Sequence, residues 1–156
     1  MAVSMLTGCA LSDKIKEKAL LDALNYEGKK TDSIVKYEEG TKANDTAETS
    51  LTKAMTAAKD AVKKLGEDKA VTDVENVTIP DSTGFSITIK EIPSKASKRD
   101  SWGAIADELN TTLSAAAHKG GSKNDTIVVN IDFISKTVTD NSKKVEKDFV
   151  IVVAKA

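Results

Sequence analysis

One histidine and a few neighbouring acidic residues are the side chains of this chain that could do acid–base chemistry. His118 is the single histidine among 156 residues, and it stands where an expected helix ends. A cationic side chain there complements the negative end of the helix dipole, whereas a Ser–His–Asp triad would need it to face a pocket. Acidic pairs such as Asp73 with Glu75 have no aromatic platform for a sugar beside them. We therefore expect no catalytic residues and predict that the protein is not an enzyme.

The patterns that hold metals and cofactors are also missing from the sequence. Because Cys9 is the only cysteine, neither a disulfide within the chain nor a cysteine-based zinc or iron–sulfur site can form. The Asn-Asp-Thr segments at 44–46 and 124–126 lack the alternating oxygen ligands of a calcium loop. Residues 120–123, Gly-Gly-Ser-Lys, follow a helix, whereas a phosphate loop precedes one. We expect no metal and no cofactor.

The N-terminal segment Leu6-Thr7-Gly8-Cys9 resembles the lipobox of bacterial lipoproteins. In that family the cysteine becomes the first residue of the mature protein and carries the lipid, so the resemblance implies that Cys9 is an acyl anchor. Only eight residues precede Cys9, and none is the lysine or arginine that opens a signal peptide. On this interpretation the sequence begins inside the signal. The alternatives are an N-terminal tail with one unpaired cysteine, or a packed helix over residues 1–10.

Length and composition indicate one globular domain. Apolar residues make up 40% and charged residues 30% of the chain, which is typical of a folded domain. We expect a signal remnant, anchor and tether at residues 1–11 and one domain at residues 12–156. A net charge of −1, with Arg99 as the only arginine, argues against nucleic acid as a partner. No apolar run approaches the roughly 20 residues of a membrane span.

Three amphipathic helices are expected. The first covers residues 12–26, and its leucines at 20, 21 and 24 lie on more than one side. The second covers residues 44–65 and the third runs from residue 100 to about residue 119, each ending before a glycine. Their stripes are so narrow that we expect both helices on one face of a sheet. That arrangement places four residues in one core: Leu51, Met55, Leu109 and Leu113.

Alternating apolar residues predict strands at 85–89 and 127–133, with another near 145–154. Weaker strands are expected at 70–79 and at 33–37. Residues 51–79 also echo residues 105–133 at an offset of 54, which any two amphipathic helices followed by strands could produce. The expected class is α+β: a mostly antiparallel sheet of four to five strands with two to three amphipathic helices layered on it, and two tandem strand–helix–strand units if the echo is a duplication.

The most hydrophobic run, residues 149–153, bears on possible partners. Successive strand residues face opposite sides of a sheet. Val150 and Val152 must therefore point away from the face into which Phe149 points. We expect the helix at 12–26 to cover them. Otherwise they form, with Val128, an exposed strip for a partner. Trp102 is a further candidate partner contact, although its place on a helical stripe favours a core position.

These observations predict a non-catalytic, lipid-anchored surface or envelope module with a binding or structural role. Its expected location is extracytoplasmic, on a bacterial cell membrane, through the lipid on Cys9, and the sequence does not identify a ligand. The first alternative is a self-assembling structural subunit of a filament or envelope layer, and the second is a small enzyme. A protein partner or self-association fits both the anchored module and the self-assembling subunit.

Overall fold

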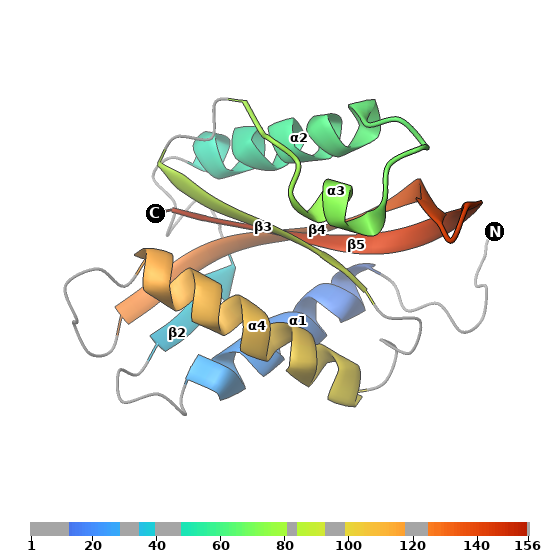
Figure 1. The fold of residues 1–156 in the computed structure, drawn as a ribbon. Helices are drawn as coiled ribbons and strands as arrows, with labels where there is room; N and C mark the ends of the chain where they lie inside the picture. Colours follow the sequence, from blue (N-terminus) through green and yellow to red (C-terminus); the bar gives the residue numbers. More distant parts are fainter. Residues whose placement is uncertain are drawn as a thin grey trace.

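The computed structural model describes residues 13–28, 35–39, 48–80, 84–92, 99–117 and 125–155. A sheet crosses the middle of the molecule, with two helices on each side of it (Figure 1). Along the chain the described elements are α1 (Asp13–Gly28), β2 (Val35–Glu39), α2 (Glu48–Lys64), α3 (Val71–Glu75), β3 (Phe85–Glu91), α4 (Arg99–Ala117), β4 (Asp125–Asp140) and β5 (Lys143–Lys155). The expected α+β class is confirmed.

The sheet is mixed, with the strand order β2-β4-β5-β3. β4 and β5 form a long antiparallel hairpin that closes at Asp140↔Lys143. Its two turn residues, Asn141 and Ser142, have φ angles of 51° and 67°, the left-handed pair that matches the twist of a two-residue hairpin. β3 pairs antiparallel with β5, whereas β2 pairs parallel with β4. The expected short strand at 33–37 is therefore present as β2, and it makes one edge of the sheet parallel.

Each face of the sheet has its own apolar core. On one face α2 and α3 cover alternate residues of β5, and this α2/α3 core contains Leu51, Ala54, Met55, Ala58, Val62, Val74, Ile89, Val138, Phe149, Ile151 and Val153. On the other face α1 and α4 cover the intervening residues, and this α1/α4 core contains Leu20, Leu24, Tyr37, Trp102, Ile105, Ala106, Leu109, Ile127, Val129, Ile131, Val150, Val152 and Ala154.

The prediction that the second and third expected helices share a face is wrong. Leu51 and Met55 of α2 lie in one core and Leu109 of α4 lies in the other, while the side chain of Leu113 lies outside the described residues. The reason is that β5 is buried on both faces, so the sheet itself supplies apolar residues to each core. A helix with a narrow apolar stripe is then sufficient to form a core on each face, because a second helix covers the rest of that face.

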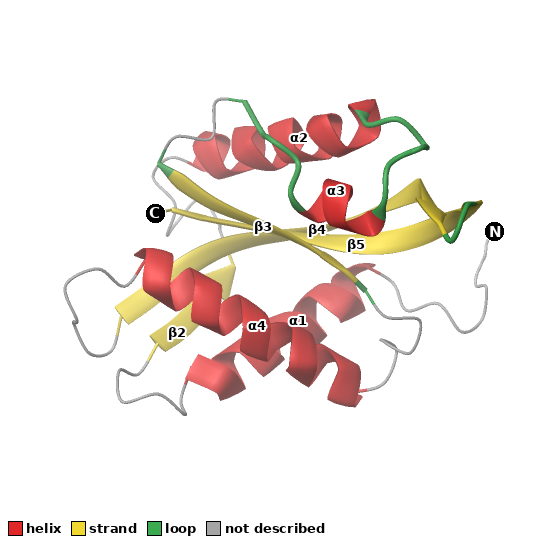
Figure 2. Cartoon of the chain, viewed as in Figure 1, coloured by secondary structure: helices red, strands yellow, loops and turns green. Residues whose placement is uncertain are grey.

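The predicted strand at 70–79 is also wrong, because residues 71–75 form the short helix α3 (Figure 2). The Asp73 carboxylate accepts a hydrogen bond from the Ala70 N–H at 2.9 Å, and the Asn76 side chain donates to the Thr72 carbonyl at 2.8 Å. These local bonds outweigh the strand propensity of the valines and threonine in the segment. At the 54-residue offset, the residues of α3 correspond to the first part of β4. The sequence similarity between the two halves therefore has no structural counterpart beyond α2 and α4.

Candidate functional site

Two of the residues singled out from the sequence, Cys9 and His118, lie outside the described residues. Val150 and Val152 are completely buried in the α1/α4 core, where Leu20 and Leu24 of α1 also lie. The first helix therefore takes part in covering these valines, as expected, but α4 shares that cover. The valines are not surface contacts in this fold. Val128 does not join them.

The predicted alternative of an exposed strip that combines Val128 with Val150 and Val152 is wrong, because of how β4 lies in the sheet. Val129 and Ile131 belong to the α1/α4 core, and Val128 packs against the α2/α3 core on the opposite face. Neighbouring strand residues face opposite sides of a sheet. No single surface can therefore contain all three valines.

Trp102 is a core residue on α4, with 3% of its surface exposed. The indole meets the ring of Phe133 edge-on, with centroids 6.3 Å apart and planes at 74°, an arrangement that aromatic quadrupoles favour. Its Nε1–H is buried and has no hydrogen-bond partner among the described residues. A buried donor without a partner costs about 1–3 kcal/mol, which the large apolar contact area of the indole offsets.

A polar network that the sequence pattern does not reveal is centred on Tyr37, which is 1% exposed. Its hydroxyl donates to Asn110 Oδ1 at 2.5 Å, and burial raises the Tyr37 pKa far above its ordinary value. Asn25 holds the backbone of the same residue: the Tyr37 N–H donates to Asn25 Oδ1 at 2.7 Å, and Asn25 Nδ2 donates to the Tyr37 carbonyl at 3.1 Å. The network joins α1, β2 and α4, and the phenol is held as a neutral donor. No spacing in the sequence relates these three positions.

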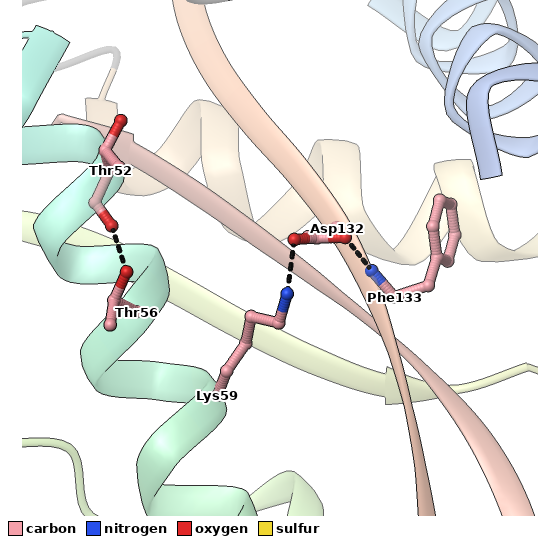
Figure 3. Close-up of polar contacts among 5 residues, drawn as sticks. All are labelled: Thr52, Thr56, Lys59, Asp132 and Phe133. Carbon is pink, nitrogen blue, oxygen red and sulfur yellow. Dashed lines mark hydrogen bonds and ion pairs between the residues drawn. The ribbon is translucent and has the colours of Figure 1, made fainter.

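A second polar contact joins α2 to β4 (Figure 3). The Lys59 ammonium lies 2.7 Å from Asp132 Oδ2, with the two side chains 29% and 36% exposed. Asp132 Oδ1 accepts the Phe133 N–H at 2.8 Å, and on α2 the Thr56 hydroxyl donates to the Thr52 carbonyl at 3.0 Å. Both carboxylate oxygens of Asp132 are thus occupied, one by the contact with α2 and the other by a local bond within β4.

A groove of about 590 Å³ lies between α2 and the segment 69–80. The groove is open because small side chains, Ala57 and Ala61, line it on the α2 side. Five of the lining residues are apolar, and the charged ones are two acids and two lysines. The complete lining is Ala57, Asp60, Ala61, Lys64, Leu65, Lys69, Asp73, Val77, Thr78 and Pro80. This volume falls in the usual range for small-ligand sites, and the lining offers both apolar and charged contacts.

No family model, curated protein or solved structure matches this chain.

Within the described parts of the chain, no three His, Cys, Asp or Glu side chains gather as metal ligands would. No helix in those parts is both long and apolar enough to cross a membrane. What the described residues bring together is an open groove with apolar and charged lining, and polar contacts that tie helices to strands. The sequence pattern does not reveal this groove, because its walls meet only when α2 packs beside a segment whose residues resemble a strand.

Proposed function

We propose that this chain is a non-catalytic, lipid-anchored module on the outer face of a bacterial membrane, attached through an acyl group on Cys9. The observation that carries the proposal is the lipobox-like Leu6-Thr7-Gly8-Cys9. The start of the folded body supports it. α1 begins at Asp13, four positions after Cys9, and four residues span at most about 14 Å. The anchor would therefore hold the body close to the membrane.

The internal polar groups support a binding or structural role over catalysis. The Tyr37 phenol, whose pKa is raised by burial, stays protonated and bonded to Asn110. Asp132 uses one oxygen for Lys59 and the other for a backbone N–H. These groups are committed to bonds within the protein. The surface available for a ligand is the groove between α2 and the segment 69–80, where apolar contact would dominate.

The outer edges of β2 and β3, the outer strands of the described sheet, favour a discrete module over a self-assembling subunit. Unpaired strand edges invite pairing with another chain, and here a helical side chain bonds to the outer edge of each outer strand. On β2 the clamp is Asn25, bonded to the Tyr37 backbone. On β3 the Glu91 N–H donates to Glu75 Oε2 at 2.8 Å. Both contacts occupy groups that edge-to-edge assembly would need.

Intact mass spectrometry of the full-length protein from a lipoprotein-processing bacterium tests the proposal. The expected product has lost Met1 to Gly8, carries acyl mass on Cys9 and sediments with membranes. Because the chain has one cysteine, the site of modification is unambiguous, and Cys9→Ser is the matched control that should stay unprocessed. A soluble wild-type product with an unmodified Cys9 would end the lipoprotein proposal.

A further inference from the structure

The outer edge of β2 carries an unusual side-chain contact. Within one strand residue, the N–H and the C=O point to the same side, and a neighbouring strand would bond to both. For Tyr37 both groups are bonded instead to the carboxamide of Asn25 on α1. This carboxamide offers one acceptor and one donor, as a residue of a neighbouring strand would. Asn25 therefore occupies the central position of a strand-pairing edge.

The sequence of β2 is complementary to itself in one orientation. In an antiparallel pair centred on Tyr37, the two copies of Tyr37 would exchange their N–H and C=O bonds. Position 36 of each copy would then stand opposite position 38 of the other, and these residues are Lys36 and Glu38. Opposite charges directly across a strand pair are favourable, whereas like charges are not. Parallel in-register pairing would place lysine beside lysine, so the antiparallel, two-fold arrangement is selected.

We propose that the β2 edge is a latent self-association surface for a second copy of this chain, kept closed by α1 through Asn25. An isologous contact of this kind closes on itself and yields a dimer, not a filament. The Tyr37 hydroxyl bonds to Asn110, whereas Asn25 bonds only to the Tyr37 backbone. Replacing the Asn25 carboxamide therefore frees the Tyr37 N–H and C=O and removes neither partner of the Tyr37–Asn110 bond. This inference is independent of Cys9 and of lipidation.

The first test is Asn25→Ala, with molecular mass followed by analytical ultracentrifugation over a hundredfold range of concentration. The wild type is expected to stay at its monomer mass of 16.6 kDa, and the variant to rise towards twice that mass as concentration increases. Asp22→Ala is the matched control, because Asp22 lies on the same helix, is exposed and pairs with Lys18. It should remain monomeric. Asn25→Asp keeps the acceptor for the Tyr37 N–H and replaces Asn25→Ala if the latter does not fold.

A charge exchange identifies the interface. In the Asn25→Ala background, Glu38→Lys places lysines opposite one another and Lys36→Glu places glutamates opposite one another, so each protein alone should return to monomer. Mixed together, the two proteins restore opposite charges at every crossing and should form a one-to-one heterodimer. Circular dichroism checks that each variant folds. A folded Asn25→Ala variant that stays monomeric overturns the proposal, as does a dimer that is indifferent to both charge changes.

Discussion

The two faces of the sheet are stabilised by different means. The α2/α3 core consists of apolar side chains, and the charged contact between α2 and β4, Lys59 with Asp132, is only partly buried. The α1/α4 core contains the hydroxyl of Tyr37 and the side chain of Asn110, which is 6% exposed, and also the indole N–H of Trp102. Apolar packing tolerates rearrangement, whereas a buried polar pair fixes one geometry. The comparison indicates that the α2/α3 face provides mainly stability and that the α1/α4 face also specifies how α1, β2 and α4 meet.

The largest expected effects come from truncating a leucine on either face. Leu109→Ala in α4 and Leu51→Ala in α2 should each lower the free energy of unfolding by about 2–5 kcal/mol, because both side chains are buried. Since the sheet separates the two sites, the double variant should show the sum within about 0.5 kcal/mol. Urea denaturation measures all three. A strong coupling between the two would mean that the leucines share a core.

The next effect belongs to the polar pair of the α1/α4 face. Asn110→Leu leaves the Tyr37 hydroxyl buried without its acceptor at 2.5 Å, so stability should fall by about 1–3 kcal/mol. Adding Tyr37→Phe removes the stranded hydroxyl and should recover part of that loss. A double-mutant cycle, again by urea denaturation, gives the coupling energy. An additive pair would contradict the idea that these side chains specify the packing of α4 on β2.

These two faces also show what the sequence could and could not predict. Periodicity identified α2, α4 and the alternation of β5, because burial of apolar residues follows the repeat of each element. It could not assign helices to faces, since that depends on which strands become neighbours. The α3 segment has strand-forming valines, but two local side-chain bonds, from Asp73 and Asn76, decide it. The Asn25–Tyr37–Asn110 network joins positions 12 and 73 residues apart, a relation that only the folded chain creates.

The pKa of Tyr37 predicts how stability depends on pH. Burial raises this pKa above the unfolded value of about 10, so the unfolded chain loses the phenolic proton first. The contribution is fully present below about pH 9 and is lost as pH rises above 10, by up to about 1.4 kcal/mol per pH unit. Tyr37→Phe should lose stability less steeply than the wild type between pH 10 and 11. Parallel curves for the two proteins would show that Tyr37 ionises as easily in the folded state as in the unfolded one.

The smallest expected effect is at the margin of the α2/α3 core, where Lys59 pairs with Asp132 at 2.7 Å. Both side chains are about one third exposed, so solvent screens the attraction, and Lys59→Met should cost less than about 1 kcal/mol. Asp132→Ala should cost more than Lys59→Met, because it also removes the acceptor of the Phe133 N–H. Asp132→Asn retains that acceptor and separates the two contributions. Measured in low and high salt, the difference between wild type and Lys59→Met should shrink as salt rises, whereas the difference between Asp132→Ala and Asp132→Asn should not. If Lys59→Met were instead as costly as Leu51→Ala, the α2/α3 face would depend on a polar contact as much as the α1/α4 face does, and the contrast between the two faces would fail.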